Sequence, residues 1–232
     1  MIVQAALLLI SSHLAAGVRV GTFAEVASEV STAQTSVEKE IEIIADKIVW
    51  ERTITIPNNK IIKLVGGTNV PVVLDAEKKG HRHLDVQSGG TLSTVNLHFK
   101  NGKEMSGCAI NSEGTLRTEG CLFTNNEAEP GGKGGAINTD RGTLNMRATT
   151  FEENSATWGG AVHIDQTTVE SINNCTFRKN KIFYYKQHAD NSGHGGGIHM
   201  TSSTIKTLEN TLFEDNEAGD PGCRWCEGGG LS

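Results

Sequence analysis

The chain has 232 residues, and 37% of them are hydrophobic, so it can bury a substantial core as one domain. A net charge of −6 without any basic cluster argues against a nucleic acid partner. Twenty-seven glycines with only four prolines suit the bends of a repetitive fold better than a disordered tail.

The N-terminus begins with an apolar run from Val3 to Ile10, broken only by Gln4, and small residues follow at Ala16 and Gly17. This is the length of a signal-peptide core with a cleavage site. We therefore expect residues 1–17 to be a signal peptide, the alternative being an apolar capping segment of the mature domain. The run is too short to span a bilayer, and no transmembrane segment is expected.

Residues 18–36 are expected to form an N-terminal cap. Val18-Arg19-Val20 predicts a short strand, and FAEVASEV from Phe23 to Val30 predicts one amphipathic helix. A cap is needed because the first coil of a stacked β structure would otherwise present unpaired strand edges. Residues 37–232 then read as the main domain. Its first strands are predicted at Ile41–Ile44, Ile48–Trp50, Thr53–Ile56, Lys60–Val65, Pro71–Leu74, Leu84–Val86 and within Thr91–Phe99.

A repeat occupies the second half of the chain. Gly134-Gly135-Ala136-Ile137 is followed by Leu144, Phe151 and Asn154, and the same series runs from Gly159 to Asn180. Copies also start at Gly107 and Gly195, and Gly228 begins another. These glycine starts are 27, 25, 36 and 33 residues apart. A recurring period of this size indicates a solenoid.

Short apolar and β-branched runs separated by Gly, Asn, Asp and Ser predict strands with polar bends. One coil cannot bury its apolar side alone, so the coils must stack. Stacking predicts an internal aliphatic column of Ile110, Ile137, Val162, Ile198 and Leu231. It predicts a structural ladder of Phe123, Phe151, Phe177 and Phe213 beside Asn126, Asn154, Asn180 and Asn216.

Four copies of Phe-x-x-Asn, alternating with Gly-Gly-Ala-Ile or close variants, resemble the repeat of the chlamydial polymorphic outer-membrane proteins. The resemblance covers residues 107–232, about half of the chain. It implies an all-β, right-handed parallel β-helix of the pectin-lyase-like type, which we expect to have about seven coils. It also implies an adhesin or passenger role, and hence a secreted or cell-surface location.

The chain stops at Gly228-Gly229-Gly230-Leu231-Ser232, the first residues of another copy. An exposed terminal coil would leave an unpaired edge. We therefore expect a truncated β-helix, a continuation of the solenoid, or end-to-end association with a partner.

Five cysteines make an odd set. Cys108, Cys121 and Cys175 stand at repeat positions, which indicates buried free thiols or a bridge between neighbouring coils. Cys223 and Cys226 form a lone CxxC, which without a second pair is a poor zinc or redox motif and favours a loop disulfide or idle thiols.

One insertion lengthens the unit between Asn180 and Gly195 by about ten residues relative to its neighbours. Insertions in solenoids map to loops on one face, where binding tends to lie. Aromatic side chains flanked by cations could contact carbohydrate or a cell-surface protein, or could fold back over the coil. The candidate binding residues are Phe183, Tyr184, Tyr185, Lys186 and His188.

An enzyme acting on polysaccharides is the main alternative. Asn138-Thr139-Asp140 and Gly193-His194-Gly195 resemble pieces of the polygalacturonase motifs, but the paired Asp-Asp and the later Arg-x-Lys are missing. The two pieces also lie in units separated by one coil. His163, His199 and Asp165 could approach one another, but histidines on an outer face are more often solvated, and neither a metal nor a cofactor is expected.

The sequence thus favours a non-catalytic, secreted or cell-surface β-helix module for adhesion, recognition or envelope structure. The alternatives are a pectin- or alginate-type hydrolase, lyase or epimerase, and a purely structural repeat segment of a larger surface protein.

Overall fold

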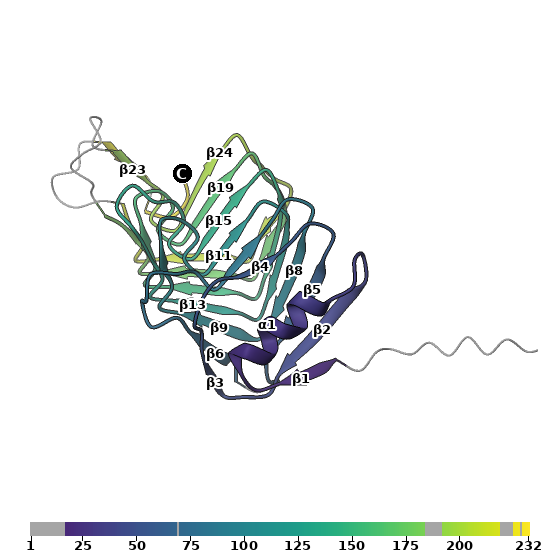
Figure 1. Ribbon diagram of the computed structural model, residues 1–232. Helices are drawn as coiled ribbons and strands as arrows, with labels where there is room; N and C mark the ends of the chain where they lie inside the picture. Colours follow the sequence, from purple (N-terminus) through teal and green to yellow (C-terminus); the bar gives the residue numbers. More distant parts are fainter. Residues whose placement is uncertain (1–16, 69, 184–191, 219–224, 228) are drawn as a thin grey trace, which may run out of the picture.

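The computed structural model describes residues 17–68, 70–183, 192–218, 225–227 and 229–232. In these residues the chain forms the expected all-β, right-handed parallel β-helix with one short helix, and its count of about six turns is close to the seven expected (Figure 1). The predicted signal peptide lies outside the described residues, except for Gly17.

The coils contribute their strands to four stacked sheets. The nine-stranded sheet contains β1 (Val18–Val20), β2 (Glu38–Ile43), β5 (Ile61–Val65), β8 (Thr91–Val95), β12 (Thr115–Glu119), β16 (Thr143–Arg147), β20 (Thr168–Asn173), β25 (Thr204–Ile205) and β26 (Leu208–Glu209). The seven-stranded sheet contains β3 (Lys47–Val49), β6 (Val72–Asp75), β9 (Leu97–Lys100), β13 (Leu122–Thr124), β17 (Thr150–Glu152), β21 (Thr176–Arg178) and β27 (Leu212–Glu214). The six-stranded sheet contains β4 (Ile54–Ile56), β7 (Leu84–Val86), β11 (Ile110–Ser112), β15 (Ile137–Asp140), β19 (Val162–Asp165) and β24 (Ile198–Thr201). The five-stranded sheet contains β10 (Lys103–Glu104), β14 (Glu127–Ala128), β18 (Ser155–Ala156), β22 (Lys181–Ile182) and β28 (Glu217–Ala218).

Neighbouring coils pair in parallel and in register. Ile110 pairs with Ile137, Ile137 with Val162, and Val162 with Ile198, and a bridge joins Ile198 to Leu231. This is the predicted aliphatic column. Equivalent positions of the repeat therefore stack on one another, apart from a register shift between β16 and β20 after Leu144. A position in the repeat thus indicates a place on the surface or in the core.

The predicted phenylalanines stack inside the helix and gain a fifth member, Phe99. Adjacent rings from Phe99 to Phe213 lie nearly parallel, with centroids 4.8 to 5.0 Å apart. In the copy that begins at Gly195, the third glycine lies close to one of these rings. At this residue, Gly197, a Cβ would already come within 3.1 Å of Cδ1 of Phe213.

The aromatic stack continues toward the N-terminus with other ring types. His83 meets Phe99 edge-on at 5.4 Å, Trp50 lies 6.0 Å from His83, and Phe23 meets Trp50 edge-on at 5.2 Å. The indole N–H of Trp50 donates to the carbonyl oxygen of His83 at 2.8 Å. The cap and the repeats thus share one continuous core.

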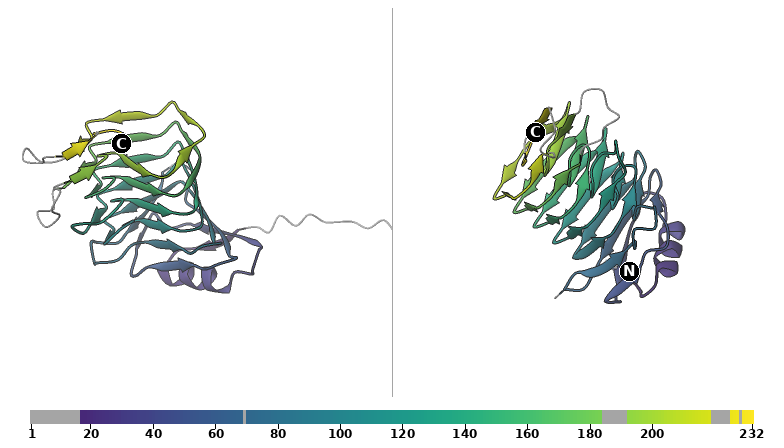
Figure 2. Two further views of the ribbon diagram at one scale, coloured as in Figure 1. Left: turned by 90° about the horizontal axis from the view of Figure 1, so that it is seen from above. Right: turned by 90° about the vertical axis from the view of Figure 1, so that its left-hand side faces the viewer.

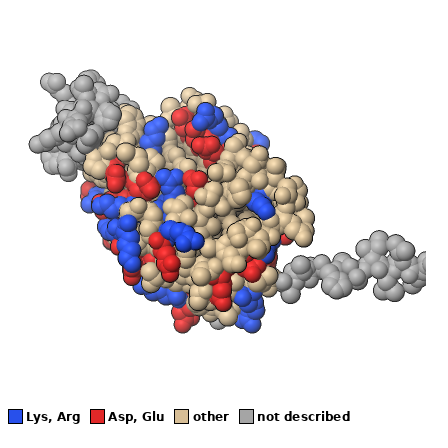
Figure 3. Space-filling model, viewed as in Figure 1, with Lys and Arg blue, Asp and Glu red and all other residues tan. Residues whose placement is uncertain are grey.

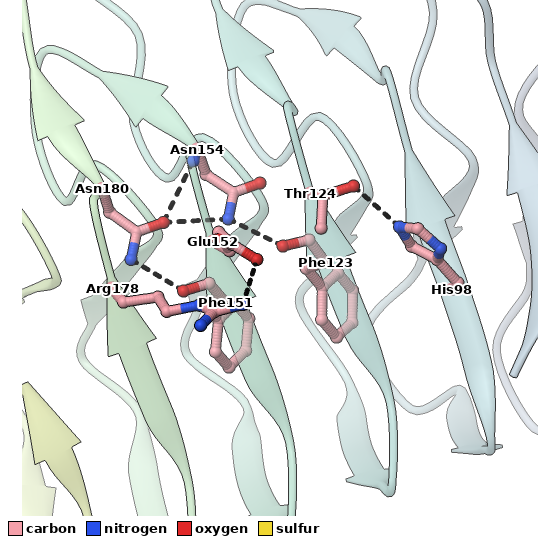
Figure 4. A network of polar contacts seen from close by, with 8 residues as sticks. All are labelled: His98, Phe123, Thr124, Phe151, Glu152, Asn154, Arg178 and Asn180. Atoms are coloured by element: carbon pink, nitrogen blue, oxygen red, sulfur yellow. Dashed lines mark hydrogen bonds and ion pairs between the residues drawn. The ribbon is translucent and has the colours of Figure 1, made fainter. Parts of the chain in front are cut away.

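The asparagine ladder lies at the bend that follows the seven-stranded sheet (Figure 4). Nδ2 of Asn126 donates to Oδ1 of Asn154, and Nδ2 of Asn154 to Oδ1 of Asn180, both at 2.9 Å. Asn180 continues the ladder to Asn216 at the same distance. Each amide also donates to the carbonyl oxygen of a phenylalanine in the preceding coil, such as Phe123 for Asn154. These hydrogen bonds satisfy the buried amides of the bend and the phenylalanine carbonyl groups beside them.

The corner between the nine- and seven-stranded sheets requires a left-handed residue, and this divides the predicted Thr91–Phe99 run into β8 and β9. The corner residue Asn96 has φ of 52°, and the residues stacked on it in later coils have φ between 47° and 60°. These corner residues are Asn96, Gly120, Ala148, Asn174 and Asn210. Asn and Gly are the residues that adopt this conformation at least cost.

The predicted cap is a helix, α1 (Phe23–Thr32), which ends two residues later than expected. Thr22 and Glu25 form a capping box at its start, and Phe23, Val26 and Val30 are buried against the first coil. Figure 2 shows α1 lying across the N-terminal end of the coil stack.

Candidate functional site

The insertion after Asn180 begins at β22 and returns at β23 (Ser192–His194), which pairs with β29 (Trp225–Glu227) in a separate two-stranded sheet. This pair projects from the side of the coils (Figure 1). Of the predicted loop residues, Phe183 is half-buried and its amide donates to the carbonyl oxygen of Ala156 at 3.0 Å. Tyr184, Tyr185, Lys186 and His188 lie outside the described residues.

Next to this insertion, the outer face of the six-stranded sheet carries a polar row, one residue from each of five successive coils. The members of the polar row are Asp85, Asn111, Asn138, His163 and His199. Nδ2 of Asn111 donates to Oδ1 of Asp85 at 2.9 Å, and Nδ2 of Asn138 donates to Oδ1 of Asn111 at 2.8 Å. Nδ1 of His163 lies 2.9 Å from Oδ1 of Asn138.

Three histidines and one tryptophan meet at the C-terminal end of the polar row. We call Trp158, His163, His194 and His199 the His–Trp cluster. The His199 ring lies 5.2 Å from that of His163, 5.3 Å from that of His194 and 5.8 Å from that of Trp158. Trp158 also lies 5.6 Å from His194. The repeat register causes this meeting, because Lys133, Trp158 and His194 each precede the first glycine of a copy and bridge to one another in turn.

His163 and His199 are held in their neutral forms. Burial, with the nearby Lys133 charge and His199, lowers the pKa of His163 to about 3, and only 1% of this residue is exposed. Burial, with His194 and Lys133, lowers the pKa of His199 to about 4 against the opposing effect of Asp165. The expectation of solvated histidines is wrong for His163, which is buried and whose ring contacts that of His199.

Asp140 and Asp165 are neighbours in register on β15 and β19. Nη2 of Arg141 lies 2.8 Å from Oδ2 of Asp140, and Nη1 of Arg82 lies 3.0 Å from Oδ1 of Asp85. The Asn138-Thr139-Asp140 and Gly193-His194-Gly195 fragments lie two coils apart, with β19 between β15 and β24. Thr139 is buried and points away from this face.

Among the described residues, no group of three or more His, Cys, Asp and Glu side chains is arranged to hold a metal ion. Asp75 pairs instead with Lys47 at 2.9 Å. Burial would raise the pKa of Asp75, but hydrogen bonds from Lys47, Asn101 and the Glu77 amide outweigh it and lower the pKa to about 2. His83 lies in the core, where Nε2 is 2.8 Å from the carbonyl oxygen of Leu74 and burial lowers its pKa to about 4.

Cys108, Cys121 and Cys175 are buried free thiols, one of the two predicted alternatives. A bridge between Cys121 and Cys175 is prevented because Thr149 occupies the same position of the intervening coil, with its carbonyl oxygen accepting from Thr176. Burial raises the pKa of Cys108 to about 12.

None of the helices in the described part of the chain is long and apolar enough to cross a membrane. Two segments of the chain, residues 120–140 and 148–165, match the Chlamydia polymorphic membrane protein repeat. The repeat resemblance is confirmed. These segments carry the phenylalanine, asparagine and glycine positions of β13 to β15 and of β17 to β19. No curated protein and no solved structure matches the chain. Proteins with this repeat are associated with the outer membrane or the cell surface, which supports a cell-surface location here.

The sequence alone singled out Asn138, His163, His194 and His199 but not Trp158, Lys133 or Asn111. A sequence signal for Trp158 and Lys133 was present, because each stands directly before the first glycine of a repeat copy, as His194 does.

Proposed function

We propose that this chain is a non-catalytic module, secreted or displayed on the cell surface, that serves adhesion or recognition. Its binding face would be the outer face of the six-stranded sheet, at the His–Trp cluster. The observation that carries the proposal is this cluster itself, in which four rings from two neighbouring coils meet beside the long insertion. A β-helix that served only as a scaffold would not need aromatic and histidine rings to meet on its outer face.

The hydrogen bonds of the polar row support a binding role over catalysis. A glycoside hydrolase needs two carboxyl groups free to act on the substrate. Here Asp140 is paired with Arg141, and Asp85 accepts from both Arg82 and Asn111. Within the described residues only Asp165 on this face is without an ion pair, so the two-carboxylate arrangement is incomplete.

The proposal is tested by measuring attachment of the purified chain to cells and to a panel of acidic and neutral glycans, while following new reducing or unsaturated sugar ends. We expect attachment without product, and a loss of attachment in Trp158→Ala. Arg117→Ala is the matched control, because Arg117 is exposed on β12 of the nine-stranded sheet, away from the cluster.

Product from pectate or alginate would establish the enzyme instead, and Asp140, Asp165 and His194 would then be the first residues to replace. Equal attachment by Trp158→Ala and the parent chain would show that the His–Trp cluster takes no part in binding. In that case Tyr184→Ala and Tyr185→Ala test the insertion itself.

A further inference from the structure

We propose that the His–Trp cluster binds an uncharged sugar, recognised by its hydroxyl groups and its apolar ring face. This inference rests on the proposed function and names the ligand class of the same site. Three features of the face carry it: the arrangement of its rings, the fixed direction of its hydrogen bonds and the balance of its charges.

The rings supply a surface for a pyranose. Trp158, His194 and His199 are each half-buried, and their centroids lie 5.3 to 5.8 Å from one another. Aromatic side chains bury apolar area at little entropic cost and keep a polar edge for hydrogen bonding. Sites for small ligands combine such rings with a few fixed polar groups.

The polar row fixes the direction of every hydrogen bond along it. The carboxylate of Asp85 can only accept, so Asn111 must turn its NH₂ group toward Asp85 and its oxygen toward Asn138. Asn138 therefore donates to Asn111 and presents its own oxygen to His163. His163 must then carry its proton on Nδ1. Arg82 anchors the whole row by donating to Asp85.

One group of this row lacks a partner. Nδ1 of His199 is buried and has no hydrogen-bond partner in the described structure, and the same is true of Oγ of Ser232, which lies beside His199 in the next coil. A buried polar atom without a partner costs free energy, and a ligand or an ordered water is a common reason for its retention. A sugar hydroxyl both donates and accepts, so it can satisfy either tautomer of His199 once the side chains that cover Nδ1 move aside.

The charges of the face cancel. Asp85 and Asp140 are paired with Arg82 and Arg141. Lys133 and Asp165, which have no ion pair among the described residues, carry opposite signs. On the side of the molecule drawn in Figure 3, Lys and Arg are interspersed with Asp and Glu. With a net charge of −6 on the chain, nothing here attracts an acidic polysaccharide.

The test is an array of neutral and acidic oligosaccharides, including one matched pair: an oligogalacturonide and its full methyl ester, which share the sugar chain and differ at the carboxyl groups, charged in one and methylated in the other. The parent chain is expected to bind among the neutral glycans and to prefer the ester over the free acid. Its affinity should stay constant between about 50 and about 500 mM NaCl, because no ion pair forms on binding. Trp158→Ala should weaken binding by about tenfold or more, and Arg117→Ala should not change it.

Two further variants guard against a folding defect. Trp158→Phe keeps a ring and should retain most of the binding, and His199→Ala removes the unpartnered nitrogen and should weaken it. Circular dichroism and the melting temperature establish that each variant is folded.

The ligand class is overturned if binding is confined to acidic glycans, if it falls steeply with salt, or if no neutral glycan binds. Attachment to cells that is lost in Trp158→Ala without any binding to neutral glycans would retain the proposed function and reject only the uncharged sugar. Binding to neutral glycans that is equal in Trp158→Ala and the parent would reject the site.

Discussion

Asn154 and Asn180 lie one coil apart, and Nδ2 of Asn154 donates to Oδ1 of Asn180 at 2.9 Å while it also donates to the carbonyl oxygen of Phe123 at 3.0 Å (Figure 4). Oδ1 of Asn154 in turn accepts from the backbone and side-chain amides of Asn126. One fully buried side chain therefore ties together three successive coils.

Asn154→Ala is expected to lower the free energy of unfolding by about 3 kcal/mol or more, since it leaves several buried groups without partners. Urea titration measures this loss. Asn145→Ala is the matched control, because Asn145 is half-buried on the outer face of β16 and makes no hydrogen bond with its side chain among the described residues. It should change stability by less than about 0.5 kcal/mol. A similar loss in both variants would contradict a structural role for the ladder.

Phe151→Ala should cost about 3 to 5 kcal/mol, because the ring is fully buried between Phe123 and Phe177 and its removal leaves a cavity. Phe213→Ala serves as the comparison, since Phe213 is half-buried and stacks on Phe177 from one side. Its cost, measured by the same urea titration, should be clearly smaller. Equal costs would mean that stacking within the column contributes little.

Gly135→Ala should be severely destabilising. A Cβ at this position would overlap the carbonyl oxygen of Gly160 in the next coil, so the two coils would have to separate. At Gly67 the nearest atom to an added Cβ is the Val70 carbonyl oxygen at 3.5 Å, an ordinary contact, so Gly67→Ala should be tolerated. Melting temperatures of the two variants decide the matter, and a stable Gly135→Ala protein would be inconsistent with the close approach of these coils.

Stability should fall as the pH is lowered from about 6.5 to about 4. His163 has a folded pKa of about 3, and His83 and His199 have folded pKa values of about 4, all below the ordinary value of 6.5. In this window the unfolded chain takes up protons that the folded chain does not, so each proton taken up favours unfolding.

His163→Asn removes the contribution of one histidine to this pH dependence. An asparagine is chosen because it continues the Asn111 and Asn138 pattern of the polar row. In this variant, the unfolding free energy should fall less steeply between pH 6.5 and 4, by up to about 1.4 kcal/mol per pH unit. Unfolding free energies at several pH values measure the slope. An unchanged slope would mean that His163 titrates normally in the folded chain.

Cys108, Cys121 and Cys175 should resist thiol reagents in the folded chain. All three are buried, and burial raises the pKa of each thiol, which suppresses the reactive thiolate. The measurement uses a Cys223→Ser, Cys226→Ser variant, so that only these three thiols remain. Three thiols should react in urea and none in buffer. A missing thiol in urea would reveal a disulfide.

The sequence by itself determined the repeat columns. Ile137 above Ile110, Phe151 above Phe123 and Asn154 above Asn126 follow from one spacing, because in-register parallel stacking places equivalent positions directly on one another. The same rule also predicted the meeting of His163 and His199.

Only the tertiary structure decided what surrounds each column. His163 is buried although it lies on the outer face of β19, where its ring contacts that of His199 from the next coil. His83 is likewise buried because Trp50 and Phe99 enclose it from other coils. Stacking converts sequence spacing into position along the helix axis and so brings Trp158 beside His194, whereas burial and protonation depend on the side chains that pack around that axis.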